Sequence, residues 1–384
     1  MKKYIKIFVT GLLFISCTQE NKNDLFTLQA IEEFLNFSID EDTRLPKFNL
    51  WTFEENNKEY IAFPNMGKEI LFYDIESKNL VKRVRYKKEG VNGVGSIINF
   101  YVTDFNHIYI QSYLLEIYVT DSAAHIRSKI KYEKTDDGVP LAMAAINTMT
   151  RNPISFIGDT MYVAQEPNRL IGNGDYVSKS PIGFVQDTTT HKITAIPLKH
   201  RLYFDNIKKV PTSTGGNRIS HCFDGTNLIY SREVSDSIYK SSPNFQKRNN
   251  YLAKSRYISH PKIESVTDAD LQKIVKRACE LPVYGNIIYD KYRNVYYRFA
   301  FPEVEMGNER NYLDIYHNGR KQFSIIILDK DMNIVGETLF PEYTYNPYLL
   351  FIRKDGLYMS ISHFKRPDFN ENVLRFQKIE LIKL

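Results

Sequence analysis

Asparagine and arginine side chains recur just before short apolar segments of this chain, and their chemistry is that of binding polar or anionic groups. An amide both donates and accepts hydrogen bonds, and a guanidinium presents a planar fork of donors that matches a carboxylate. The residues of this first set are Asn99, Arg151, Asn152, Asn217, Arg218, Asn286 and Asn346. A second set follows the next apolar segment and consists of Tyr113, Arg169, Arg232 and His363.

Two interpretations of these residues are open. Each asparagine taken singly is explained as a turn residue, because Asn bonds its own backbone and tolerates left-handed backbone angles. Taken together, the side chains predict a polar, weakly positive funnel that suits a sugar, a carboxylate or a peptide terminus. The ligand-binding hypothesis names Asn152, Arg169, Asn217, Arg218, Asn286, Asn346 and His363.

Motifs of common reaction chemistry are incomplete in this sequence. The segment Ile171–Tyr176, "IGNGDY", lacks the Lys and Ser/Thr of a phosphate-binding loop. The segment Gly93–Ile98, "GVGSII", lacks the second glycine of a nucleophile elbow, and the eight histidines do not show the spacing of a helical zinc site. We therefore predict no metal site and no cofactor, and the sequence identifies no catalytic residue. Paired carboxylates are a separate case, because their pairing is spatial and a sequence does not display it.

A repeated strand pattern would bring the polar residues together. Six segments show an apolar strand, a turn rich in Asp, Asn or Gly, and a second apolar strand. From the second segment onward the turn aspartates are 55, 65, 66 and 65 residues apart, at Asp104, Asp159, Asp224, Asp290 and Asp355. Aspartate bonds its own backbone in such turns, so we interpret these five residues as turn formers.

Each repeat is expected to supply four short strands, which is the unit of a β-propeller blade. The strands expected in the first repeat are Asn49–Glu54, Tyr60–Phe63, Glu69–Asp74 and Leu80–Tyr86. Later repeats carry long insertions at Pro167–Pro181 and Glu303–Lys321, which we interpret as loops. The sequence therefore predicts an all-β protein: a six-bladed β-propeller with four-stranded antiparallel blades.

A short helix is expected between blades four and five, over residues 267–282. Thr267 and Asp270 have the spacing of a capping box, with Asp in place of Glu or Gln. The apolar residues of this segment would share one helix face, which we expect to pack against the side of the propeller. They are Leu271, Ile274, Val275 and Ala278.

The sixth repeat is one strand short, because only Val373–Ile382 follows its second strand before the chain stops. The stretch Leu25–Ile39 precedes the first repeat and does not belong to any of the six repeats. Pairing it with the last blade would close the ring and remove an open sheet edge. A helix over Leu28–Leu35 is the competing interpretation. The propeller would then span residues 25–384.

The first residues indicate export. Lys2, Lys3 and Lys6 precede the apolar run Ile7–Ile15, which is too short to span a bilayer and fits a signal peptide. Ser16 and Cys17 follow, as in bacterial lipoprotein signals that are cut just before a lipidated cysteine. We expect a signal peptide over 1–16, lipidation of Cys17 and a tether over 17–24. A plain secretory signal and a membrane anchor are the alternatives.

The residue after Cys17 is not Asp, and this favours the outer membrane, on its periplasmic or cell-surface side. The chain carries 51 basic and 45 acidic residues, and removing residues 1–16 takes three lysines, so the excess becomes 48 − 45 = +3. Such a balance argues against a nucleic-acid binder. The 27 Tyr and 24 Phe favour strands. Cys222 and Cys279 are expected to be buried free thiols, with a disulfide as the alternative.

With its lipoprotein start, its six turns and the segment "YNPYLLF" that opens the last repeat, the chain resembles a family. It is similar to uncharacterised outer-membrane lipoproteins of Bacteroides-type bacteria, a domain of unknown function with a six-bladed TolB-like propeller. The resemblance covers the whole chain and implies no catalytic residues.

The predicted function is a membrane-anchored binding or scaffold module for a glycan, a peptide or a protein, with no nucleic-acid partner. The alternative is an enzyme acting on extracellular glycan or peptide with carboxylates at the channel mouth. Two carboxyl groups about 5–10 Å apart in the mouth would favour the enzyme. A third interpretation is docking to other outer-membrane proteins through an exposed apolar patch on the side loops.

Overall fold

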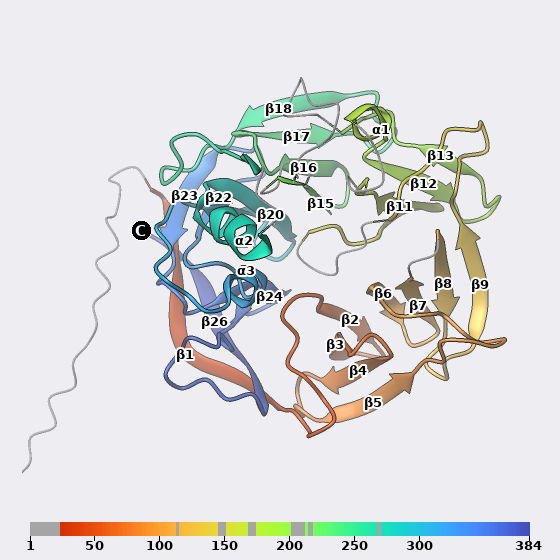
Figure 1. The fold of residues 1–384 in the computed structure, drawn as a ribbon, viewed down its shortest axis with the longest axis horizontal. Helices are drawn as coiled ribbons and strands as arrows, with labels where there is room; N and C mark the ends of the chain where they lie inside the picture. Colours follow the sequence, from red (N-terminus) through yellow and green to blue (C-terminus); the bar gives the residue numbers. More distant parts are fainter. Residues whose placement is uncertain are drawn as a thin grey trace, which may run out of the picture.

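Six radial sheets surround a central channel in the computed structural model of this chain (Figure 1). The structure describes residues 24–112, 115–144, 151–167, 174–200, 212–213, 218–266 and 270–384. Blade 1 consists of β2 (Trp51–Glu55), β3 (Lys58–Asn65), β4 (Glu69–Asp74) and β5 (Leu80–Arg85). Blade 2 consists of β6 (Asn99–Asp104), β7 (His107–Gln111), β8 (Glu116–Thr120) and β9 (Ile126–Lys131). Blade 3 consists of β10 (Ser155–Ile157), β11 (Thr160–Ala164), β12 (Gly183–Asp187) and β13 (Ile193–Ala195).

The second half of the ring repeats this order, with the first strand of each blade beside the channel and the fourth at the rim. Blade 4 consists of β15 (Ile219–Phe223), β16 (Leu228–Arg232), β17 (Ser237–Ser241) and β18 (Arg248–Leu252). Blade 5 consists of β20 (Val283–Asp290), β21 (Val295–Phe301), β22 (Ser324–Leu328) and β23 (Ile334–Leu339). Blade 6 consists of β24 (Asn346–Arg353), β25 (Gly356–Ser360), β26 (Val373–Lys383) and β1 (Phe26–Ser38). The predicted six-bladed propeller of four-stranded antiparallel blades is confirmed.

The strand β1 closes the ring as predicted. It pairs antiparallel with β26 from Phe26 opposite Lys383 to Ser38 opposite Val373. The Leu25 N–H also donates to the carbonyl of Val335 in the neighbouring blade 5. The competing helix over Leu28–Leu35 is therefore wrong, because this stretch pairs with β26 on both sides of a register shift between Ala30 and Phe34.

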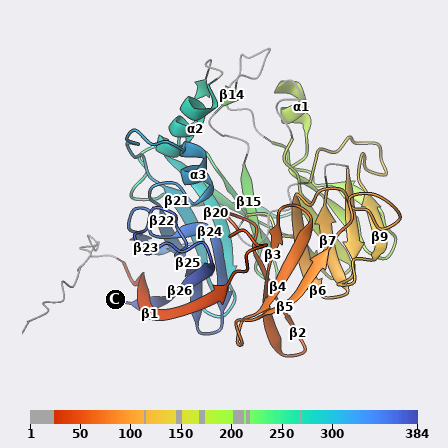
Figure 2. The same cartoon turned by 60° about the horizontal axis from the view of Figure 1, so that its bottom comes forward.

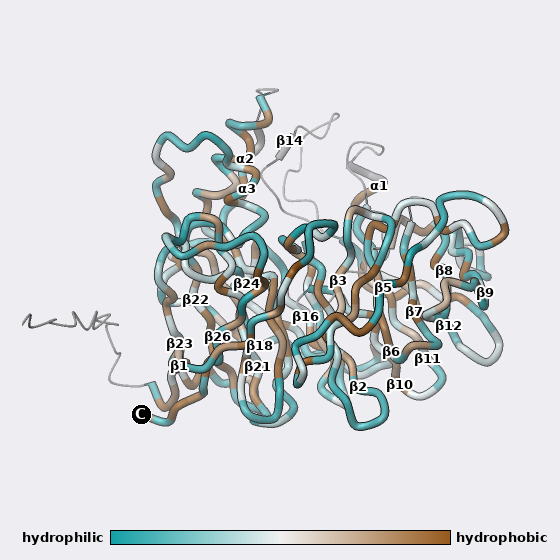
Figure 3. The backbone as a smooth tube through the Cα atoms, turned by 90° about the horizontal axis from the view of Figure 1, so that it is seen from below, coloured by the Kyte–Doolittle hydropathy of each residue, from teal (hydrophilic) through white to brown (hydrophobic). Residues whose placement is uncertain are grey.

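The turn aspartates define one face of the ring, which we call the lower face. Asp104, Asp224 and Asp290 each accept a hydrogen bond from the backbone N–H two residues later, at 2.8–3.0 Å. Their prediction as turn formers is confirmed. The opposite, upper face carries the loops that lead into the innermost strands. Figure 3 shows hydrophobic residues along the strands and hydrophilic ones in the loops at both faces.

Apolar clusters fill the junctions between neighbouring blades rather than one central core. Phe37 of β1 illustrates this, since it packs edge-on against Phe376 of blade 6 and Tyr73 of blade 1. Similar clusters occupy the other five junctions. Each blade is thus held by its two neighbours, and the ring depends on closure. Within the described residues, none of the helices has the length and apolarity to cross a bilayer.

The predicted helix between blades four and five is present as α2 (Leu271–Glu280). It is shorter than expected because Asp270 is itself the N-cap and accepts a hydrogen bond from the Gln272 N–H at 2.9 Å. Thr267 lies outside the described residues. Leu271 is 58% exposed, so it does not belong to the buried face, which Cys279 completes instead.

Helix α2 stands on the upper face and not against the side of the propeller, contrary to the prediction (Figure 2). It packs on α3 (Tyr312–His317), and Val275, Cys279 and Ile315 share a small apolar cluster there. The predicted loops contain α3 and α1 (Gly174–Lys179). The strands β14 (Thr212–Ser213) and β19 (Ser265–Val266) form a two-stranded ribbon. Cys222 and Cys279 are buried and free, as predicted.

Candidate functional site

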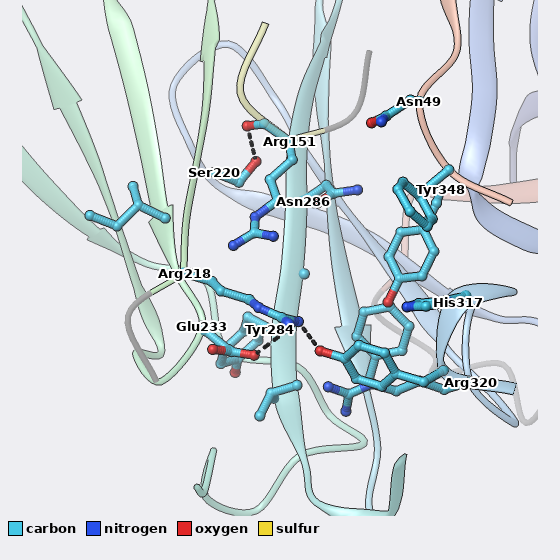
Figure 4. A pocket seen from close by; sticks show the side chains of 16 residues that line it. Asn49, Arg151, Arg218, Ser220, Glu233, Tyr284, Asn286, His317, Arg320 and Tyr348 are labelled. Atoms are coloured by element: carbon cyan, nitrogen blue, oxygen red, sulfur yellow. Dashed lines mark hydrogen bonds and ion pairs between the residues drawn. The ribbon is translucent and has the colours of Figure 1, made fainter. Parts of the chain in front are cut away.

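A pocket of about 220 Å³ opens at the upper mouth of the channel (Figure 4). We call it the mouth pocket. Its walls come from the loops that lead into the innermost strands and from α3. The polar side chains that line it are Asn49, Arg151, Arg218, Ser220, Glu233, Asn286, His317 and Arg320. The aromatic ones are Phe48, Tyr284, Phe301, Tyr316 and Tyr348.

Arg218 reaches into the mouth pocket from the residue before β15. One of its guanidinium nitrogens lies 3.9 Å from Glu233 and donates to the Tyr316 hydroxyl. Its guanidinium also lies over the Tyr316 ring, 5.2 Å from the centroid. Burial opposes the charge, but Tyr316 and Glu233 outweigh burial and raise the pKa of Arg218. Arg218 is therefore a fixed cation with one carboxylate beside it.

Arg320 enters from the opposite wall, just after α3, and is 4% exposed. Its Nη1 donates to the carbonyl of Leu281 at 3.1 Å. The guanidinium stacks over Phe301 and Tyr316, 4.8 and 5.4 Å from the ring centroids. Its buried Nε has no acceptor, and none of the carboxylates in the described residues forms an ion pair with it.

Arg151 and Ser220 tie blades 3, 4 and 5 together beside the pocket. The Arg151 side chain forms an ion pair with Glu166 at 3.3 Å. Its backbone carbonyl accepts a hydrogen bond from the Ser220 hydroxyl at 2.8 Å. The same hydroxyl oxygen accepts from the Ile287 N–H at 3.0 Å. These bonds hold the pocket wall on strands rather than on flexible loops.

Two neutral groups complete the polar lining. Asn286 lies in an irregular stretch of β20 and is 4% exposed, yet no described residue hydrogen-bonds its amide. His317 packs against Phe48. Burial, together with Lys47, lowers the pKa of His317 against the opposing effect of Asp314. The imidazole is therefore neutral at neutral pH and adds no charge.

The predicted binding residues divide between the mouth pocket and the framework around it. Arg218 and Asn286 line the pocket. Asn152 lies behind it, where its side-chain oxygen is 3.2 Å from Nδ1 of His221. The Asn346 amide donates to the Lys47 carbonyl, and its oxygen accepts from a backbone N–H two residues later. Asn346 therefore bonds its own turn, whereas Asn152 contacts the ring of a residue in the next blade.

Among the other predicted residues, His363 is fully buried and stacks on Phe364, away from the mouth pocket. Arg232 donates to the carbonyl of Lys199. The Asn99 amide bonds Gln111 and accepts from Asn49. The remaining predicted residues, Arg169, Asn217, Tyr113 and the lipidation candidate Cys17, lie outside the described residues.

Several pocket residues were not found from the sequence. Asn49 precedes the first blade as Asn99 precedes the second, so extending the asparagine pattern to blade 1 would have identified it. Glu233 directly follows Arg232 at the end of β16. His317 and Arg320 come from α3 and the residues after it, in a segment interpreted as a loop, and no sequence pattern marks them.

A second cavity of about 600 Å³ occupies the lower half of the channel. Its walls include Trp51, Tyr101, Phe156, Phe223 and Tyr289, one from each of the first five blades. The Trp51 indole N–H donates to the carbonyl of Val102 at 2.7 Å. The channel thus has three arginines at its upper end and a ring of aromatic side chains, with Glu54, Glu59 and Lys291, at its lower end. No cluster of metal-ligating side chains is found in the part of the chain that the structure describes.

Comparison with solved structures identifies one strong likeness. The crystal structure of a DUF4221 family member from Bacteroides vulgatus ATCC 8482 superimposes with a TM-score of 0.81 at 26% identity, over 94% of this chain and 100% of that chain. BamB from Moraxella catarrhalis has a TM-score of 0.39 at 8% identity, over 92% of this chain and 98% of its own. The propeller domain of Cps50 (Swd1) from Myceliophthora thermophila has a TM-score of 0.39 at 7% identity, over 90% and 99%.

No curated protein matches the sequence. The family model described as a domain of unknown function, DUF4221, matches residues 26–339, from the closing strand β1 to the end of β23. The match covers most of the ring, and the similar Bacteroides structure bears the same family name. The resemblance inferred from the start of the chain, the six turns and the segment "YNPYLLF" is confirmed as regards the family of unknown function and its six-bladed propeller, and the chain belongs to the DUF4221 family.

Proposed function

We propose that this protein is a lipid-anchored binding module that holds a small polar ligand in the mouth pocket. The observation that carries the proposal is the convergence of Arg218, Asn286 and Arg320 on one cavity, where the buried Nε of Arg320 has no acceptor among the described residues. Buried polar groups in folded proteins are almost always hydrogen-bonded. A ligand that bonds Asn286 and the arginines would meet this requirement.

The lining supports binding over chemistry. Among the described residues that line the mouth pocket, Glu233 is the one carboxylate, whereas three residues are arginines. Glycoside hydrolysis generally uses a pair of carboxyl groups across the scissile bond. The enzyme alternative would need a second acid within reach of Glu233, and a binding module needs none.

Anchoring is the second part of the proposal. The lysines, the apolar run and Cys17 support a lipid anchor in the outer membrane. All described elements of the fold begin at Asp24 or later, so a lipid on Cys17 leaves the propeller intact. Scaffolding of partner proteins is compatible with this placement, but the mouth pocket gives a specific reason to expect a small ligand.

A ligand screen with one pocket variant tests the proposal. The full chain, purified in detergent, is screened by thermal shift against monosaccharides, sugar acids, amino acids and short peptides. A ligand at 100 times its Kd should add about 2.7 kcal/mol to the free energy of unfolding. Arg218→Ala should weaken binding of any hit at least tenfold, which corresponds to about 1.4 kcal/mol.

The matched control is Arg248→Ala, which removes the same charge from the exposed strand β18. Binding that is equally strong in both variants would place the ligand elsewhere and refute the mouth pocket as the site.

A further inference from the structure

We infer that the ligand of the mouth pocket carries a single negative charge on a carboxylate, and that Arg320 is the residue that selects it. This inference rests on the proposed function, because it names the chemistry of the ligand held at that site. Beyond the proposed function, it assigns the charge of the ligand and the side chain that binds this charge.

Among the described residues that line the pocket, two of the three arginines have a carboxylate beside them. Arg151 has Glu166 at 3.3 Å and Arg218 has Glu233 at 3.9 Å. Arg320 has no carboxylate partner among the described residues. Counted over the described residues alone, one positive charge has no carboxylate beside it, and it lies on Arg320, the most buried of the three arginines.

An unpaired buried cation is costly, because its desolvation is not offset by a counterion. Two aromatic faces and one backbone carbonyl, that of Leu281, compensate Arg320 only in part, and its Nε has no acceptor. Its backbone adds a second cost, since φ is +65°, a left-handed angle that side chains with a Cβ disfavour.

Arg298 shows what a structural arginine looks like in the same molecule. It is fully buried and stacks on Tyr284 with its guanidinium 3.6 Å from the ring centroid. Its nitrogens donate to the Ser231 hydroxyl and to the carbonyls of Ser235, Asp236 and Ala253. Every nitrogen of Arg298 is engaged, whereas Arg320 makes one such bond. Strain and unsatisfied groups of this kind concentrate at functional sites.

The number of unpaired positive charges in the pocket indicates the class of anion that would bind there. A carboxylate carries one negative charge, whereas a phosphate monoester carries about 1.5 to 2 at neutral pH. A single uncompensated guanidinium therefore matches a carboxylate. The Asn286 amide can bond a hydroxyl or carbonyl of the same ligand, and the Tyr348 ring offers an apolar wall. The ligand is a small organic acid with a polar or ring-shaped body.

The first arm of the test needs no ligand. Arg320→Met is compared with Arg298→Met in the full chain by thermal unfolding. We expect Arg320→Met to unfold at the same temperature as the native chain or higher, because it removes an unpaired buried charge. We expect Arg298→Met to unfold well below it. If Arg320→Met is destabilised as much as Arg298→Met, Arg320 is a structural residue and the inference is wrong.

The second arm measures affinity by calorimetry with probes that share one ring: glucose, glucuronate, glucose 6-sulfate and glucose 6-phosphate. N-acetylphenylalanine and its amide form a second pair, which separates a sugar acid from a peptide carboxyl terminus as the source of the charge. In at least one series, the carboxylate should bind ten times or more tighter than its neutral partner. Arg320→Met should weaken that binding roughly 10- to 100-fold, and Arg248→Met should leave it unchanged.

The measured affinities distinguish a failure of the carboxylate inference from a failure of the proposed function. Neutral probes that bind in the mouth pocket as tightly as the acids would uphold the proposed function and overturn the carboxylate. Tighter binding of the phosphate or the sulfate than of glucuronate would overturn the carboxylate in the same way. If no probe of either charge binds, the proposed function fails and the inference falls with it.

Discussion

His221 and His363 are buried bases that the fold keeps uncharged. The pKa of each is lowered to about 4, chiefly by burial, and for His363 also by the nearby Lys365 and Arg366. The ordinary value is about 6.5. The folded state therefore binds fewer protons than the unfolded state between these values. Its stability is complete above pH 6.5 and is lost as the pH falls toward 4.

His363→Asn should flatten this pH dependence. Each titrating histidine contributes a slope of at most about 1.4 kcal/mol per pH unit within the window. The free energy of unfolding in urea, measured at pH 7, 5.5 and 4.5, should fall less steeply in the variant than in the native chain. Carboxylates titrate equally in both proteins, so the difference isolates the histidine. Parallel slopes would contradict a neutral buried His363.

Single residues were the level at which the sequence was least informative. The type of Asn346 identified a polar side chain, but not whether its amide would be used by the backbone or by a ligand. The Lys47 carbonyl that it bonds lies 299 residues away in the sequence and becomes a neighbour only when the ring closes. Arg320 carried no signal, because its importance comes from its lack of a carboxylate partner among the described residues of the fold, which only the structure displays.

Among the secondary-structure elements, β1 is the strand that closes the ring by completing blade 6. Phe37 joins blade 6 to blade 1 and is completely buried. Phe37→Ala should cost about 3–5 kcal/mol, because it removes a large side chain from a packed junction. Urea unfolding measures this cost directly.

Gln29→Ala is the matched control for that change, since Gln29 is an exposed residue of the same strand. We expect it to shift the free energy of unfolding by less than about 0.5 kcal/mol. Equal effects at the two positions would mean that β1 does not carry the closure.

The strands could be predicted from the sequence. Of the two helices that pack together on the upper face, α2 could be predicted and α3 could not. The repeat of turn aspartates fixed the strand pairs because a hairpin turn is a local signal. Helix α2 showed its apolar spacing over ten residues. Helix α3 has only six residues, too few for a periodic pattern, and its buried Ile315 packs on α2 across the cap. Contact between two insertions is a tertiary property, so the sequence did not reveal the wall that supplies Arg320.

At the scale of the whole molecule, the proposed lipid on Cys17 leads to a prediction about where the protein is found in the cell. Cys17→Ala should release the protein from the membrane fraction, because no acyl chain can then be attached, and several chains bind a bilayer far more firmly than one. Fractionation of cells with radiolabelled palmitate measures both attachment and lipidation. A chain that stays in the membrane fraction without label would refute a lipid on Cys17. Ser16→Ala keeps the cysteine and serves as the control.

The direction of β1 has a consequence for how such an anchored ring would be oriented. The strand starts at the lower face, where Phe26 lies opposite Lys383, and ends at the upper face (Figure 2). A lipid on Cys17, joined to the start of β1 by the tether over 17–24, would draw the aromatic end of the channel toward the bilayer. The mouth pocket with its arginines would then face the aqueous space, and a solute could reach it without crossing the lipid headgroups.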